Sequence, residues 1–158
     1  MAKSTDSGSA DWNKLAALSE GDQTAQMVER FTHIQGLDAE ARSESLGSII
    51  RGELELSDEE MAELSRSRLL AWLSMDKDMA KSSAEEFQTA MDGAPGMIAM
   101  KHATIDQTVS LHFDREQVTL LAELDPKIFA SMPGVGSIDT DEPAAPADED
   151  PPPWWKFW

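Results

Sequence analysis

The stretch from Ser57 to Met91 constrains the fold most strongly, because it combines a well-defined helix start with a long apolar stripe. Ser57 and Glu60 have the spacing of a capping box, in which each side chain accepts a hydrogen bond from the other residue's backbone amide. Apolar residues then recur at helical spacing: Met61, Leu64, Leu69, Trp72, Leu73, Met79, Phe87 and Met91. We expect this stretch to form the centre of a helical domain.

The end of this stretch is marked, whereas its middle fits two interpretations. Gly93 tolerates a positive φ and Pro95 cannot continue a helix, so the run should end there. The segment around Asp76 is rich in charge, which suits either the solvated face of one long helix or a break between two helices. If the chain breaks, Ser83 and Glu86 have the spacing of a further capping box.

Three shorter helices are predicted before this stretch, each with a cap residue, an apolar stripe and a glycine stop. They run from Asp11 to Gly21, from Asp22 to Gly36 and from Asp38 to Gly52. Their apolar residues are Trp12, Leu15, Leu18, Met27, Val28, Phe31, Ile34, Ala41, Leu46, Ile49 and Ile50. One-sided stripes of this kind need a shared core, so the helices should pack together.

Residues 96–113 fit both a helix and a strand. One apolar set has helical steps of four and three, and another occupies alternate positions of a β-branched stretch. The helical set is Ile98, His102, Ile105, Val109 and His112, and the alternating set is Ile105, Val109, Leu111 and Phe113. Because proline is favoured at the start of a helix, Pro95 favours the helix, with a short strand near 104–113 as the alternative.

The last folded part is predicted to be helical as well. Asp114 and Gln117 have capping-box spacing, and an apolar stripe follows up to Pro126. Ile128, Phe129 and Met132 should then return to the core. The predicted fold class is therefore all-α, a small helical bundle or helical array over residues 11–133.

Both ends of the chain differ from this domain in composition. Residues 1–10 are small and polar, and residues 134–150 form an acidic Pro/Ala linker, so we expect both segments to be disordered. Residues 151–158 join three prolines to a tip of Trp154, Trp155, Lys156, Phe157 and Trp158. Aromatic rings at the end of an acidic tether gain from being covered, because each can bury about 150–250 Å².

Charge and composition exclude several classes of function. The formal net charge of −17 argues against nucleic acid as a partner, because phosphate binding needs clustered Lys and Arg. The chain has no cysteine, so disulfides, thiolate metal sites and cysteine nucleophiles are ruled out. No apolar run approaches the roughly 20 residues of a membrane span, and the first residues lack a signal-peptide core. We expect a cytoplasmic protein. Only the aromatic tip is of a kind that could contact the periphery of a membrane.

The sequence offers little support for a metal, a cofactor or a catalytic centre, and we predict none of them. The acidic segment that starts at Asp76 resembles a calcium loop only superficially, because Lys81 stands where the glycine is required and Phe87 where the final acid is required. The histidines His33, His102 and His112 lack the spacing of a helical metal site. The one pair to inspect for acid–base chemistry is His102 with Asp106.

These observations predict a non-enzymatic accessory, scaffold or adaptor subunit of a larger assembly. Its helical domain would bind a protein partner or self-associate through the Leu/Met/Trp stripe, and the aromatic tip would dock a partner protein, a membrane or its own domain. The partner-binding residues are predicted to be Trp154, Trp155, Phe157 and Trp158. One alternative is an acidic regulator or nucleic-acid mimic that binds a basic partner through Glu53, Glu55, Asp58, Glu59, Glu60 and Glu63. A second alternative is a small enzyme of unknown chemistry.

Overall fold

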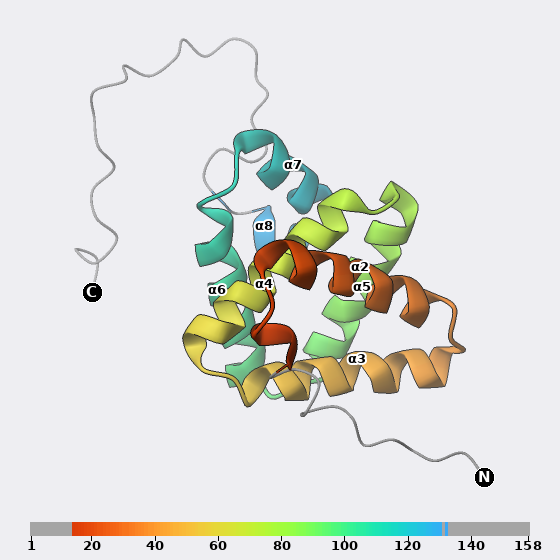
Figure 1. The fold of residues 1–158 in the computed structure, drawn as a ribbon. Coiled ribbons are helices and arrows are strands. Elements are labelled where there is room, and N and C mark those ends of the chain that lie inside the picture. The colour runs from red at the N-terminus through yellow and green to blue at the C-terminus, as the bar shows by residue number, and fades with distance from the viewer. Residues whose placement is uncertain (1–13, 131, 133–158) are drawn as a thin grey trace, which may run out of the picture.

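The computed structural model describes residues 14–130 and 132, and within these residues every regular element is a helix (Figure 1). In chain order the elements are α2 (Glu20–Gln35), α3 (Ala39–Leu54), α4 (Asp58–Ser74), α5 (Lys77–Asp92), α6 (Gly96–Ser110), α7 (Arg115–Leu124) and the single turn α8 (Pro126–Phe129). The predicted all-α bundle is confirmed. The alternative of a strand near 104–113 is wrong, because α6 covers most of that segment.

Local capping sets most of the helix boundaries. The capping boxes Ser57–Glu60 and Asp114–Gln117 both form, and Asp38 caps α3 as expected. The central stretch breaks at Asp76, whose carboxylate accepts hydrogen bonds from the amides of Asp78 and Met79 and so starts α5. This local cap makes the suggested Ser83–Glu86 box wrong, since Ser83 lies inside α5 and is buried there.

Two of the three predicted glycine stops are misplaced. Gly21 lies inside α2, because the side chain of Ser19 accepts from the amide of Asp22 and caps the helix before the glycine is reached. Gly52 also lies within its helix, which continues to Leu54. Gly36 and Gly93 do end α2 and α5. The terminal segments 1–10, 134–150 and 151–158, and the predicted cap Asp11, lie outside the described residues.

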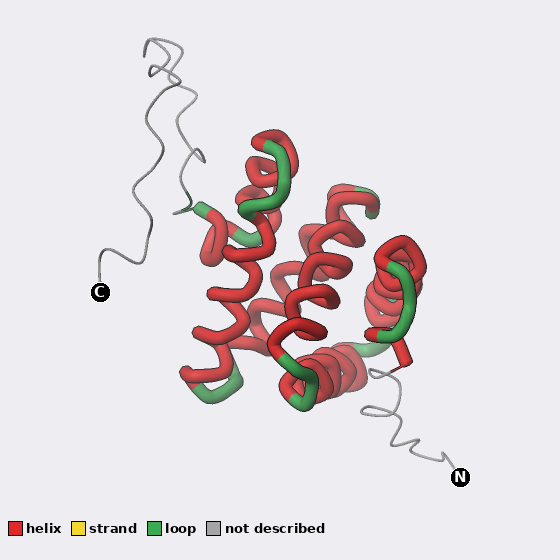
Figure 2. The backbone as a smooth tube through the Cα atoms, turned by 60° about the vertical axis from the view of Figure 1, so that its left-hand side comes forward, coloured by secondary structure: helices red, strands yellow, loops and turns green. Residues whose placement is uncertain are grey.

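Helix α4 lies at the centre of the arrangement and packs against α2, α5 and α6. Helix α3 packs mainly against α5, and α7 and α8 close the opposite end of the bundle (Figure 1). Short loops join successive helices (Figure 2). No helix of the described chain has the length and apolar character needed to cross a bilayer.

Aromatic side chains from α2, α4 and α5 meet in the middle of the core. The ring centroids of Phe31 and Trp72 are 5.7 Å apart, and Phe87 lies 5.7 Å from Trp72 with its ring tilted by 72°. Such tilted pairs add about 0.5–1.5 kcal/mol beyond the burial of their area. Most of the Leu/Met/Trp stripe lies in this core, where its side chains pack within the domain.

Ile128, Phe129 and Met132 are buried, as predicted for the end of the domain. Two hydrogen bonds tie this end to α6: the Gln107 side chain donates to the Ile128 carbonyl at 2.8 Å, and the Ser110 hydroxyl donates to the Met132 sulfur at 3.1 Å. The short helix α8 therefore adds its apolar side chains to the core.

Candidate functional site

The most unusual chemistry of the described chain is an arginine sealed inside the core. Arg68 follows Leu64 by four residues and precedes Trp72 by four, so it lies on the inward face of α4. Its side chain is fully buried. Charged side chains are almost never buried to this degree unless they are paired, so the partners of Arg68 determine what this site can do.

Two carboxylates from different helices neutralise this guanidinium. Arg68 Nη1 donates to Glu53 Oε1 of α3 at 2.7 Å, and Nη2 donates to Asp106 Oδ1 of α6 at 2.7 Å. The hydroxyl of Ser65 lies 3.3 Å from Nη2 and accepts a third hydrogen bond. The guanidinium carbon lies 4.5 Å from the centre of the Phe87 ring, within cation–π range. We call Glu53, Arg68, Asp106 and the neighbouring His102 the buried cluster.

Burial dominates the electrostatics of this cluster. Desolvation raises the pKa of Glu53 and that of Asp106, and the nearby charge of Arg68 offsets part of the rise. Desolvation opposes the charged form of Arg68, but Asp106 and Glu53 together hold its pKa above the ordinary value. The cluster thus joins α3, α4 and α6. Removing any one of its charged side chains would leave the remaining buried charges poorly compensated.

His102 completes the cluster as a neutral side chain. Its Nδ1 lies 3.5 Å from Glu53 Oε2, and its ring contacts Phe87 edge-on with 6.2 Å between centroids. Burial, helped by the positive charges of Arg68 and Lys101, lowers its pKa to about 3. A histidine with this pKa carries no charge near neutral pH.

The suggested acid–base pair of His102 and Asp106 does not form. Asp106 directs its carboxylate at Arg68, whereas His102 lies beside Glu53. Both residues are buried, so substrate and solvent do not reach them in this state. His33 and His112 are exposed and belong to other helices or loops. Among the described residues, no group of three or more His, Asp and Glu side chains is placed to hold a metal ion.

One of the six acidic residues proposed as the surface of a nucleic-acid mimic, Glu53, does not lie on the surface. Glu53 was expected to lie on the surface, but it is sealed in the core because Arg68 provides its counter-charge there. Asp58 pairs with Lys101 at 2.7 Å, and Glu60 is engaged in its own capping box. Glu55, Glu59 and Glu63 remain exposed.

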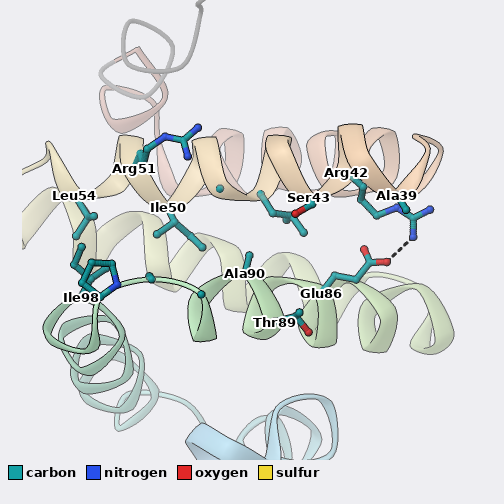
Figure 3. A pocket seen from close by; sticks show the side chains of 15 residues that line it. Ala39, Arg42, Ser43, Ile50, Arg51, Leu54, Glu86, Thr89, Ala90 and Ile98 are labelled. Carbon is teal, nitrogen blue, oxygen red and sulfur yellow. Dashed lines mark hydrogen bonds and ion pairs between the residues drawn. The ribbon is translucent and has the colours of Figure 1, made fainter.

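A groove lies on the surface between α3 and α5 (Figure 3). It encloses about 610 Å³. Its apolar lining consists of Ala39, Leu46, Ile50, Leu54, Ala90, Ala94, Pro95 and Ile98. Gly47 lets the α3 backbone form part of the wall, and the Arg51 guanidinium lies 3.2 Å from where a Cβ of Gly47 would stand.

Arginines lie at both ends of this groove. Arg42 forms an ion pair with Glu86 across one end and donates to the Leu37 carbonyl at 2.9 Å. Arg51 lies toward the other end, where it is exposed and forms no ion pair with any described residue. The groove therefore offers apolar walls and one guanidinium that is available to a ligand's carboxylate.

The sequence-predicted site residues Trp154, Trp155, Phe157 and Trp158 lie outside the described residues. Sequence reasoning missed Arg68 and Arg51 as residues of interest. Arg68 could have been found from its place in the α4 stripe, at a position that periodicity assigns to the core. Comparisons with known protein families, curated proteins and solved structures return no match for this chain.

Replacing Arg68 with methionine tests the role of the buried cluster. Arg68→Met leaves two carboxylates without a counter-charge in the core, so the free energy of unfolding should fall by about 3–5 kcal/mol. The matched control is Arg66→Met on the same helix, whose ion pair with Glu20 is partly exposed and should contribute about 1 kcal/mol or less. Urea unfolding measures both, and an equal loss in the two variants would contradict a structural role for the cluster.

The second prediction concerns pH. The folded pKa of His102, about 3, lies below its ordinary value of 6.5, so the unfolded chain takes up a proton in this window that the folded chain does not. This group therefore lowers the free energy of unfolding as the pH falls from 6.5 toward 3, by up to about 1.4 kcal/mol per pH unit. Denaturant unfolding at several pH values should show a shallower acid loss for His102→Gln than for the unmodified chain.

Asp125 should change stability with pH in the opposite direction to His102. Burial raises its pKa from 3.8 to about 6, so its contribution to stability is present at low pH and is lost as the pH rises through 6. Asp125→Asn should therefore steepen the acid loss that His102→Gln makes shallower. An unchanged pH dependence in His102→Gln would show that the ring is open to protons in the folded state.

Proposed function

We propose that this chain is a non-enzymatic adaptor whose α3/α5 groove docks an apolar, acid-bearing segment of a partner protein. The groove is the observation that supports the proposal, because it combines apolar walls with Arg51, which has no ion-pair partner among the described residues. The buried cluster supports it indirectly, since its acidic and basic side chains are buried in the core, away from any substrate.

The size of the groove indicates the kind of segment it takes. Arg42 and Arg51 are nine positions apart on one helix, which corresponds to about 13 Å of rise. That length suits about four residues of an extended peptide or about two turns of a helix. A carboxylate on the ligand would lie at Arg51, and its apolar side chains would lie against Ile50 and Ala90.

The aromatic tip is proposed as the second docking element of the adaptor. Trp154, Trp155, Phe157 and Trp158 are of the residue types that dominate binding energy at protein interfaces. A chain with two separate docking elements can hold two components together, which is the property that defines an adaptor. A cytoplasmic location, with the tip resting on a protein or at a membrane surface, belongs to the same proposal.

An acidic regulator that binds a basic partner is the alternative function. Its support is the net charge of −17 and the exposed carboxylates of Glu55, Glu59 and Glu63 near the start of α4. This interface would consist of several ion pairs and should weaken steeply with salt, whereas groove binding, with one ion pair at Arg51, should weaken less.

A library of random peptides displayed on phage tests the groove. Selection against the immobilised full chain should enrich peptides that combine apolar residues with an acid, and Arg51→Glu should weaken their binding at least tenfold. The matched control is Arg115→Glu, which reverses an exposed arginine on α7 and should leave binding unchanged. Failure to enrich peptides, or equal binding by both variants, would contradict the groove as the docking site.

Alanine substitution of the four aromatic residues of the tip tests the second docking element. Capture from a cell extract with the full chain as bait should retain one component that the substituted chain loses and that Arg51→Glu keeps. Co-sedimentation with anionic lipid vesicles, compared between the same two chains, reports a membrane target instead. If the substituted chain captures the same proteins and binds vesicles equally, the tip has no docking role.

A further inference from the structure

The methionines of the described chain differ widely in their access to solvent. Met97 is 82% exposed and Met100 is 67% exposed. The other methionines of the described residues are buried or half-buried: Met27, Met61, Met75, Met79, Met91 and Met132. Two thioether side chains therefore stand apart from the rest, and we call Met97 and Met100 the methionine pair.

The start of α6 brings the two members of the pair together. Met97 is the second residue of the helix and Met100 follows it by three positions, so both lie on one face of the first turns. Both line a hollow of about 330 Å³ that also includes Asp58 and Lys101. Lys101 Nζ lies 2.7 Å from Asp58 Oδ1, so an ion pair borders the two thioethers. A small polar molecule can reach this part of the surface.

The composition of the chain makes these two sulfur atoms its most accessible ones in the described part. The chain has nine methionines and no cysteine, so every sulfur atom in it is a thioether and no thiol of its own competes for an oxidant. An oxidant must touch the sulfur to react, which burial prevents. The Met132 sulfur is further engaged, because it accepts a hydrogen bond from the Ser110 hydroxyl at 3.1 Å.

From this contrast we propose that the methionine pair is a reversible oxidation site for peroxides. A lone pair of the thioether sulfur attacks one oxygen of hydrogen peroxide, an S–O bond forms and the O–O bond breaks. The second oxygen leaves as water after it takes the proton of the first, and the product is a methionine sulfoxide. The sulfur loses two electrons and the peroxide gains them. A methionine sulfoxide reductase reverses the change with two electrons from a pair of thiols, which become a disulfide while the oxygen leaves as water.

The fold tolerates this change because the pair lies outside the core. A sulfoxide on Met61 or Met91 would place a polar group among the apolar side chains of the core, at a cost in stability. On Met97 and Met100 the new oxygen stays in water. Oxidation of the pair therefore adds two hydrogen-bond acceptors to the surface beside Lys101 and leaves the helix packing as it is.

Treatment of the folded full chain with hydrogen peroxide at neutral pH, followed by mass spectrometry, tests the site. Trypsin should release residues 82–101 as one peptide, which carries the buried Met91 as an internal control beside Met97 and Met100. Both members of the pair should gain oxygen at least tenfold faster than Met91, whereas all three should react at similar rates in urea. Equal rates at Met91 and the pair in the folded chain would overturn the proposal. So would a reaction of the pair that is much slower than in urea.

Leucine variants and enzymatic repair test the rest of the proposal. Met97→Leu with Met100→Leu should abolish the fast phase of oxygen uptake. Met75→Leu with Met79→Leu is the matched control, because it also removes two methionines at little cost to packing, and it should keep that phase.

Reversibility needs a separate measurement. Methionine sulfoxide reductases for both epimers, with dithiothreitol, should return the oxidised chain to its original mass. Circular dichroism and the urea midpoint of the chain oxidised only at the pair should match those of the unmodified chain. An oxidised chain that loses its helices, or that the reductases leave unrepaired, would overturn the claim that the site is reversible.

Discussion

The ion pairs of Arg68 are the interaction on which the rest of the structure depends. A buried guanidinium is unfavourable unless it is paired, and Glu53 and Asp106 form its two ion pairs from two other helices. Because each carboxylate must lie within hydrogen-bonding distance of one side chain of α4, the positions of α3 and α6 around α4 are specified together. Apolar packing alone tolerates shifts of a helix along its axis, whereas these paired hydrogen bonds do not.

This arrangement also decides which surfaces are left for function. The side chains most capable of chemistry, namely His102, Asp106 and Glu53, are all sealed in the core. The pairing of Asp106 with Arg68 also holds the one carboxylate of α6 in the core. What the folded part offers to other molecules is a groove with apolar walls and the guanidinium of Arg51, which forms no ion pair with any described residue.

The sequence predicted the fold well where the structure depends on interactions between residues that are close together in the chain. Capping residues such as Ser57 and Asp114 act within one helical turn, so their spacing alone is sufficient. The sequence did not decide whether the chain breaks at Asp76, because a charged segment is compatible with both a solvated helix and a new helix start. The prediction that Gly21 ends a helix was wrong because Ser19 already caps α2. The glycine therefore falls in the first turn of that helix.

The site was harder to predict, because it depends on contacts between distant segments. Charge normally indicates the surface, and only the position of Arg68 in an apolar stripe argues otherwise. Its partners are 15 and 38 residues away in the chain, so no spacing rule connects them.

Hydrogen–deuterium exchange of backbone amides, followed by NMR in native conditions, tests most directly whether the buried cluster is part of the core. Amides of α4 around Arg68 and of α6 around His102 should exchange only through global unfolding, with the same free energy as measured by denaturant. Exchange of these amides at rates far above the global unfolding limit would contradict that claim. It would show that the cluster opens to solvent within the folded state.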